Sequence, residues 1–265
     1  MSKSGYYKYA KTLIKDRDKK DYLLIKQIFE RGNCKLGWRP IQMSLKSDYE
    51  IIMNHKKIKR IKREYGLITK IRAKNPYKMI AKKTKEHCTF KNILNRNFKQ
   101  STPGMVLCTD ITYLYYKNGQ KAYLSVIKDI ASKEVVSWHI SREITMKFVL
   151  DSVKDLRKIK TMDNKTIIHS DQGFHYTNPG YIKVVKSLKL IQSMSRKGNC
   201  WDNAPIESFF GHLKDDVEYN KAETINELSD MINKYMDYYN NRRFQWDIKK
   251  MTPVMYRNHL LEKCS

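Results

Sequence analysis

The chain of 265 residues is long enough to bury one or two hydrophobic cores, and 41% hydrophobic with 30% charged residues predicts that most of it folds. Its 53 basic and 27 acidic residues give a net charge of +26, which favours a polyanionic partner over a merely solvated basic surface. No apolar run is long enough to span a membrane, and no secretory signal is visible. The five cysteines are odd in number and have no paired spacing, which argues against a disulfide framework or a zinc cluster.

The positive charge is distributed unevenly. Residues 1–100 contain 28 Lys or Arg and 8 Asp or Glu, a net charge of +20, whereas residues 101–265 contain 25 and 19, a net of +6. This asymmetry predicts a nucleic-acid-binding region followed by a folded enzyme core.

Helical patterns dominate residues 1–97. Apolar residues recur at helical spacing around Tyr22–Phe29, and residues 35–41 then interrupt the pattern. In the next helix, Asn54 is placed to cap the start and Gly66 to end it, with an apolar stripe of Ile58, Ile61 and Tyr65.

The opposite side of that second helix is basic. We expect DNA contacts from its four cations and from one arginine in the interrupting segment 35–41: Lys56, Lys59, Arg60, Arg63 and Arg39. An ordinary solvated face is the alternative for this helix alone, and the charge around it favours DNA. Residues 70–97 are lysine-rich with few apolar residues, which is typical of a basic linker.

Strand patterns begin near residue 98. Residues 106–113, 121–129 and 135–140 are rich in β-formers, and Asn118-Gly119 predicts a hairpin with a type I′ turn between the first two. A helix over 146–158, a buried strand over 166–170, a helix over 181–188 and a strand over 190–194 follow. This order predicts a mixed α/β sheet with flanking helices.

Two further helices close the chain. Ile206, Phe209, Phe210, Leu213 and Val217 form one apolar stripe, preceded by a polar turn, Asp202-Asn203, that suits a cap. Thr224 and Glu227 then form a capping box that opens another amphipathic helix.

Three carboxylates occupy positions suited to metal chemistry. Asp110 lies in the first strand, Asp171 at the end of the buried strand, and Glu207 near the start of a covering helix. Mg²⁺ prefers oxygen ligands, and two such ions can activate the attacking oxygen and stabilise the leaving oxygen of a phosphodiester. We therefore expect these acids to be the catalytic and metal-binding residues, with two Mg²⁺ or Mn²⁺ ions when DNA is bound.

Two more residues are candidate neighbours of the acids. Lys214 is seven residues after Glu207, about 20° away around the helix, so it is placed to hold a DNA phosphate in the same cleft. His169 precedes Asp171 by two residues and lies on the same side of the strand; a packed, hydrogen-bonded histidine is an equal alternative to a site neighbour.

The motifs around these acids resemble a known family. Asp171 and Glu207 are separated by 35 residues, as in the retroviral integrase and transposase superfamily with that spacing. The segments 109–113, 169–173 with Tyr176, 195–210, 239–243 and 251–253 resemble, in order, the motifs of IS3-family insertion-sequence transposases, most like the IS150 branch. Leu107 departs from the tryptophan common in the family, and we expect this to alter packing only.

The resemblance implies an RNase H-like integrase catalytic core, a mixed five-stranded sheet with flanking helices. It predicts a basic, helix-turn-helix-like region over 1–75, a linker over 76–97, the core over 98–220, and a C-terminal helix and tail over 221–265. It also implies a metal-dependent DNA transposase that cuts insertion-sequence ends and joins the 3′-hydroxyl to target DNA.

The resemblance further implies partners and a location. We expect terminal-repeat and target DNA, homo-oligomers on DNA, an upstream-frame helix-turn-helix protein, no membrane, and a nucleoid-associated place in the bacterial cytoplasm. The chain resembles the second-frame product, without the upstream heptads of a full fusion. Two alternatives are a protein that only binds DNA or a partner, tested by binding without cleavage, and an RNA–DNA hybrid nuclease, tested with a hybrid substrate.

Overall fold

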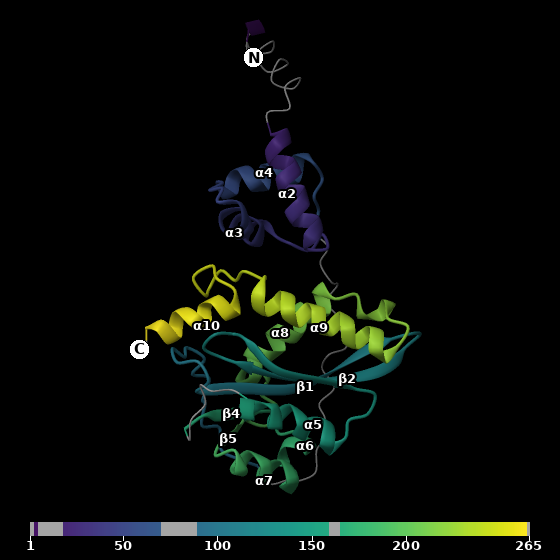
Figure 1. Cartoon of the computed structure of the whole chain (residues 1–265), viewed down its shortest axis with the longest axis vertical. Helices are drawn as coiled ribbons and strands as arrows, with labels where there is room; N and C mark the ends of the chain where they lie inside the picture. Colours follow the sequence, from purple (N-terminus) through teal and green to yellow (C-terminus); the bar gives the residue numbers. More distant parts are fainter. Residues whose placement is uncertain (1–2, 5–17, 70–88, 159–164, 264–265) are drawn as a thin grey trace. The chain divides into compact units, whose positions relative to one another are not determined.

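The computed structural model describes residues 3–4, 18–69, 89–158 and 165–263 (Figure 1). By its internal contacts the chain divides into two compact units, residues 1–73 and 74–265. Residues 76–88 of the predicted linker lie outside the described part of the chain.

The first unit is a small helical domain. Three helices, α2 (Lys19–Arg31), α3 (Trp38–Tyr49) and α4 (His55–Glu64), bury a shared apolar core. The Asn54 side chain accepts the Lys56 amide (2.8 Å) at the start of α4, and Gly66 follows its end with a φ of +65°. Both predicted ends of this helix are confirmed, because each uses a residue suited to the local backbone.

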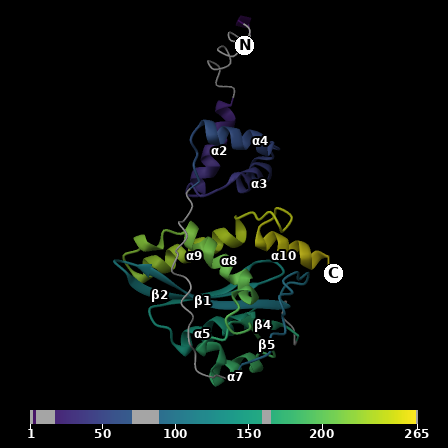
Figure 2. The same cartoon turned by 180° about the vertical axis from the view of Figure 1, so that it is seen from behind.

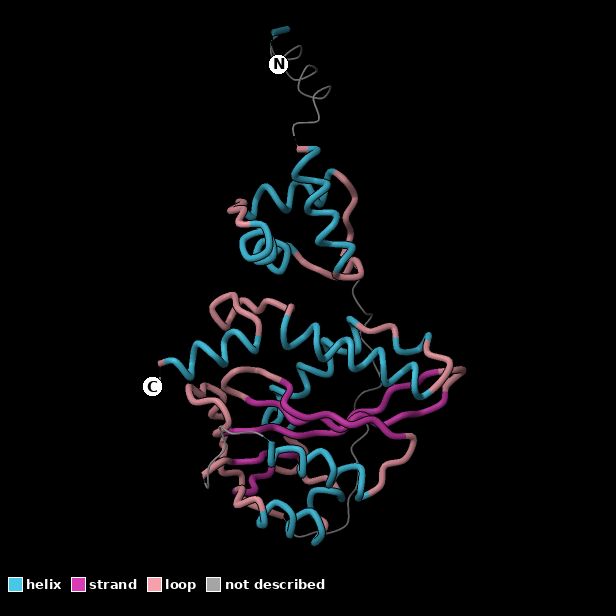
Figure 3. The backbone as a smooth tube through the Cα atoms, in the orientation of Figure 1, coloured by secondary structure: helices cyan, strands magenta, loops and turns pink. Residues whose placement is uncertain are grey.

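The second unit is built on a five-stranded sheet in the order β3-β2-β1-β4-β5 (Figure 3). The strands are β1 (Val106–Tyr116), β2 (Gln120–Asp129), β3 (Val135–Ser141), β4 (Ile167–Ser170) and β5 (Ile191–Met194). β1, β2 and β3 pair antiparallel, whereas β4 runs parallel to β1 and to β5. The predicted mixed sheet is confirmed.

The β1–β2 hairpin turns one residue earlier than the sequence predicts. Tyr116 lies opposite Gln120, and the Gly119 amide donates to the Tyr116 carbonyl (3.1 Å), so Lys117 and Asn118 are the central pair. Their φ values are +31° and +53°, and Gly119 follows at +92°. The Lys117 amide also donates to the carbonyl of Ala222 (3.1 Å), a distant contact that the local Asn-Gly pattern cannot reveal.

Helices cover both faces of this sheet (Figures 1 and 2). One face packs against α5 (Met146–Lys154), α6 (Phe174–Thr177) and α7 (Pro179–Ser187), and the short 3-10 helix η1 (Asp155–Lys158) continues α5. The other packs against α8 (Ala204–Asp216) and α9 (Ile225–Asn241). The short 3-10 helices η2 (Cys200–Asn203) and η3 (Tyr219–Lys221) precede α8 and α9.

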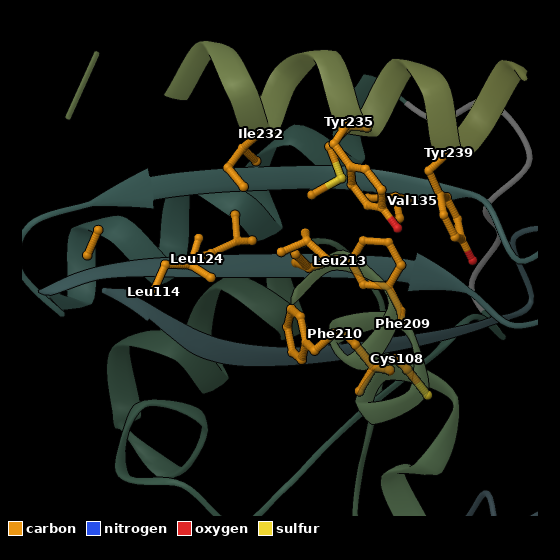
Figure 4. Packing of buried hydrophobic residues seen from close by; sticks show 14 of the residues in the cluster. Cys108, Leu114, Leu124, Val135, Phe209, Phe210, Leu213, Ile232, Tyr235 and Tyr239 are labelled. Atoms are coloured by element: carbon orange, nitrogen blue, oxygen red, sulfur yellow. The ribbon is translucent and has the colours of Figure 1, made fainter. Parts of the chain in front are cut away.

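The α8 and α9 side chains form an aromatic and aliphatic layer over the sheet. Figure 4 shows Phe209, Phe210 and Leu213 of α8 gathered beside the strands with Tyr235 and Tyr239 of α9. The phenyl ring of Phe209 meets the Tyr239 ring edge-on at a centroid distance of 4.8 Å. This layer fixes α8 firmly against the sheet.

The end of the chain contains a helix where the sequence predicted only a tail. This helix, α10 (Pro253–Glu262), begins at a Thr252 cap and packs with α9. The Arg257 guanidinium holds both carboxylate oxygens of Glu134 (2.7 and 2.8 Å), which joins α10 to the start of β3. The helix was missed because its apolar residues follow no clear helical stripe. Among the described helices, none is both long and apolar enough to cross a bilayer.

Candidate active site

Asp110 lies in β1, and Asp171 directly follows the neighbouring parallel strand β4. Cys108 of β1 pairs with His169 of β4. Asp110 comes two residues after Cys108, and Asp171 comes two residues after His169. Adjacent strands lie about 4.8 Å apart, so this register brings the backbones of the two aspartates to neighbouring positions where β4 ends. Asp110 is partly buried and Asp171 is exposed.

Backbone amides orient both aspartates. The Ile111 amide donates to Oδ1 of Asp110, and the Gly173 amide donates to Oδ1 of Asp171, each at 2.8 Å. Charge-assisted bonds of this kind fix a carboxylate more firmly than neutral ones. The two acids are therefore each oriented by a backbone amide one or two residues further along the chain.

The phenol of Tyr176 lies close to both aspartates. Burial raises the pKa of Tyr176 well above its usual value, and the negative charges of Asp110 and Asp171 raise it further. Its ring is buried and meets the ring of Tyr181 edge-on at 5.3 Å. Tyr176 is therefore a buried residue within electrostatic range of both acids.

Glu207 lies on α8, the helix that covers the Asp110 face of the sheet. Alternation along β1 puts Asp110 on the same side as Cys108, which packs in the cluster that contains Phe210 of α8 (Figure 4). Glu207 is in the first turn of that helix and is exposed, next to the buried Ile206. The sheet and the helix therefore contribute acids to one side of the unit.

The Lys214 side chain on α8 contacts β1, the strand that carries Asp110. Its Nζ lies 4.9 Å from the ring centroid of Tyr113, three residues after Asp110 in β1. This cation–π contact places a positive charge near the strand that carries the first acid.

The described residues contain no preformed metal cage. Among them, no three or more His, Cys, Asp or Glu side chains are grouped closely enough to hold a metal ion. Carboxylates that carry like charges repel one another, and Mg²⁺ usually takes only one or two carboxylates together with water and substrate phosphate. The adjacent Asp110 and Asp171 offer such a pair of oxygen donors.

His169 is a packed core residue. It is fully buried, its Nδ1 lies 2.9 Å from the Ser193 hydroxyl, and burial lowers its pKa. Of the two interpretations open from the sequence, the structure matches the hydrogen-bonded core histidine. Its buried side chain extends from β4, the strand that ends directly before Asp171.

The basic residues of the first unit differ in their surroundings. All five of the predicted DNA contacts are exposed: Arg39, Lys56, Lys59, Arg60 and Arg63. Arg60 binds Asp18 (2.7 Å) and Glu64 (3.1 Å), while Lys59 and Arg39 lie 4.8 and 5.1 Å from the Trp38 ring. The contact of Arg60 with Asp18 joins two different helical segments, and helical spacing alone did not suggest it.

The polar turn before α8 does not cap the helix as the sequence predicted. Asn203 occupies the cap position without a side-chain hydrogen bond to the helix. The Asp202 carboxylate instead binds Arg96, Arg196 and Asn92. Charged hydrogen bonds to two guanidinium groups outweigh one cap bond, and two of the partners, Arg96 and Asn92, are too distant in sequence for a local pattern to find.

Comparisons with known proteins agree with this architecture. Residues 100–200 and 207–261 each match an integrase core domain, and residues 15–75 match a helix-turn-helix-like domain. The chain is 34% identical over 260 residues to the putative transposase InsK for insertion sequence element IS150 of Escherichia coli (strain K12), covering 97% of this chain and 90% of that relative. It is 36% identical over 123 residues to the transposase InsF for insertion sequence IS3A of the same organism, covering 46% of this chain and 42% of that relative.

The chain belongs to the IS3 family of insertion-sequence transposases.

Solved structures agree on the fold of this transposase. A chain of the simian T-cell lymphotropic virus intasome aligns over 82% of this chain and 74% of its own length, with a TM-score of 0.51 and 17% identity. The predicted RNase H-like integrase core with a helical region before it and a helix after it is confirmed. The integrase core and the transposase relatives support a polynucleotidyl transferase that serves DNA transposition, with DNA as its partner.

Proposed function

We propose that this transposase cleaves phosphodiester bonds at the ends of its insertion sequence and joins the freed 3′-hydroxyl to target DNA. Asp110, Asp171 and Glu207 are the proposed catalytic acids. The observation that supports the proposal is the parallel register of β1 and β4, in which Cys108 and His169 are paired and each is followed two residues later by one of the first two acids. The 35-residue interval to Glu207, on the helix over the same sheet face, supports the third.

The donor set fits a hard divalent cation. The aligned aspartates supply carboxylate oxygens oriented by backbone amides, and Glu207 is exposed on the adjacent helix. Mg²⁺ or Mn²⁺, as two ions when DNA is bound, would polarise the scissile phosphate and stabilise negative charge on the leaving oxygen. The protein orients the acids, and Lys214 holds a DNA phosphate beside them.

The same proposal covers the DNA-contacting residues, the protein partners and the cellular location of the transposase. The exposed cations Lys56, Lys59 and Arg63 of α4 would bind the terminal repeats through phosphates and groove contacts. We further propose that the transposase acts as a homo-oligomer on DNA, with an upstream-frame helix-turn-helix protein, on the bacterial nucleoid. The division into residues 1–75, 76–97, 98–220 and 221–265 is also proposed as a functional one.

The test is cleavage and joining of labelled duplexes that carry the ends of the element encoding the chain. We expect activity with Mg²⁺ or Mn²⁺, none with EDTA, and a loss of at least about a hundredfold in Asp110→Asn, Asp171→Asn and Glu207→Gln. Asp230→Asn, an exposed acid on α9, is the matched control and should cleave normally. DNA affinity should be retained in all variants.

Two outcomes would contradict the proposal. Full cleavage by Asp110→Asn or Glu207→Gln protein would remove the three acids from the chemistry. Binding of end DNA without cleavage in either metal, with or without the upstream-frame protein, would favour a protein that only binds, and preferential cutting of an RNA–DNA hybrid would favour a hybrid nuclease.

A further inference from the structure

A fully buried carboxylate lies directly before the helix that carries Glu207. The Asp202 side chain has no exposed surface and accepts hydrogen bonds from three other residues. Arg196 donates to it from its backbone amide (3.0 Å), Nε (2.9 Å) and one terminal nitrogen (2.8 Å). Arg96 donates from Nε (2.6 Å), and Asn92 donates from its amide (3.0 Å).

These bonds satisfy a group that burial alone would make unfavourable. Arg196 above all, with Arg96, holds the pKa of Asp202 far below its usual range, so it stays ionised. Removing the charge while keeping the shape would leave several donors unpaired around a buried site. The cluster therefore has one geometry in which all its groups are satisfied.

Residues 92–96, which contain two of the residues that bind Asp202, also contact β5 and, through it, β4, the strand that precedes Asp171. The amides of Ile93 and Leu94 donate to the Ser193 hydroxyl (3.0 and 3.3 Å). That hydroxyl lies 2.9 Å from Nδ1 of His169, two residues before Asp171 in the chain. Residues 92–96 thus tie the ends of β4 and β5 to the start of α8.

The start of α8 has no side-chain cap of its own. Its cap residue Asn203 makes no side-chain cap bond. One additional tether comes from Lys128 of β2, which is buried and donates to the carbonyl of Pro205 (3.2 Å). Glu207 follows Asp202 by five residues, so any shift of this anchor moves the third acid with it.

We propose that Asp202 is a positioning residue of the active site: clamped by Arg196, Arg96 and Asn92, it sets the place of Glu207 relative to Asp171. This inference rests on the proposed function of the three acids. Asp202 touches neither DNA nor metal in this role and acts only through the start of α8. Misplacement of a catalytic group by about 1 Å can cost a hundredfold in rate.

The main test replaces Asp202 by asparagine in the full chain. Asp202→Asn should lower the cleavage rate at saturating DNA and weaken Mn²⁺ binding, measured by electron paramagnetic resonance, each by about ten- to a hundredfold. The Kd for end DNA should stay within about twofold, because the DNA-binding surface is untouched. Hydrogen exchange should accelerate in residues 204–210 and not in β1 or α9. Asp230→Asn is the matched control for the same chemical change.

Several results would overturn the inference. One is folded Asp202→Asn protein with normal cleavage, normal Mn²⁺ binding and normal exchange over 204–210. Another is a loss of cleavage that comes with faster exchange throughout the second unit, since that would make Asp202 a general stabilising residue. If the unsubstituted chain cleaves nothing, the proposed function fails, and exchange over 204–210 with Mn²⁺ binding still decides the role of Asp202.

Milder variants keep the inference testable if Asp202→Asn does not fold. Arg96→Ala and Asn92→Ala each remove one clamp and leave the Arg196 bonds in place. Each should lower the cleavage rate about three- to tenfold and accelerate exchange over 204–210, at an unchanged Kd for DNA. Normal cleavage and exchange in both variants would overturn the proposal.

Discussion

The Gly173 amide donates a 2.8 Å hydrogen bond to Oδ1 of Asp171, and a Cβ atom at position 173 would lie 2.8 Å from that same oxygen. Real Cβ atoms do not approach so closely, so any side chain at position 173 would displace the carboxylate. The glycine is needed here for close approach, since its φ of −63° is open to any residue.

Gly173→Ala should therefore impair catalysis without unfolding the protein. We expect cleavage of the end duplex to fall about ten- to a hundredfold, because the second acid is moved from its place. Gly211→Ala adds the same methyl group on α8, where nothing lies within 4 Å, and should cleave normally. Equal rates for both variants would show that the position of the Asp171 carboxylate is not critical.

The exposed cations of α4 should not contribute equally to DNA affinity. Arg63→Ala should weaken binding to all sequences and reduce the slope of log K against log salt by about 0.9, the loss of one phosphate contact. Arg60→Ala should change that slope less, because Asp18 and Glu64 already hold its guanidinium. Fluorescence anisotropy across a salt series measures both, and a larger slope change for Arg60→Ala would contradict this assignment.

Asn240 joins α9 to the start of β3. Its side chain accepts the Val135 amide and donates to the Val135 carbonyl, both at 2.9 Å in a buried setting. Asn240→Ala leaves both backbone groups unpaired and should lower the free energy of unfolding by about 1–3 kcal/mol or more. Urea unfolding followed by circular dichroism is the measurement. Asn226→Ala, on the exposed side of α9, is the control, and an equal effect of both variants would disprove the role of Asn240.

Lys62 makes the stability of the first unit depend on pH. Burial lowers the pKa of Lys62 to about 8, although Nζ donates to the Leu36 carbonyl (2.8 Å) and the Thr69 hydroxyl (3.0 Å). Between pH 8 and its ordinary pKa of 10.5, the unfolded state binds more protons than the folded state, so stability from this group rises with pH.

Lys62→Met should remove that rise while keeping the apolar stem packed on Phe29, whose ring lies 4.1 Å from Nζ. Urea unfolding at pH 7 to 10.5, followed by the resonance of fluorine-labelled Trp38, reports on this unit. The difference in unfolding free energy between variant and parent should shrink or reverse as pH rises. A difference that stays constant across the range would refute the effect.

Much of the fold is visible in local patterns. The strands of the core alternate or run apolar between turn residues, and Asn54 and Thr224 cap their helices as predicted, with Thr224 accepting the Glu227 amide (3.1 Å). These features depend on residues within a few positions of one another. The α10 helix was missed because it lacks a clear apolar stripe, and the predicted β1–β2 hairpin forms with its turn one residue earlier, at Lys117 and Asn118.

The sequence by itself determined the family motifs, the strand and helix carrying each acid, and the basic character of the first hundred residues. Only the tertiary structure decided which charged groups make intramolecular contacts that stabilise the fold. Arg60 and Lys62 bind within the first unit, and Asp202 binds Arg96 across 106 positions of sequence rather than capping its own helix. Such partners meet only when each unit has folded. In the second unit the desolvation of the buried Asp202 carboxylate then favours the pairing that satisfies its charge.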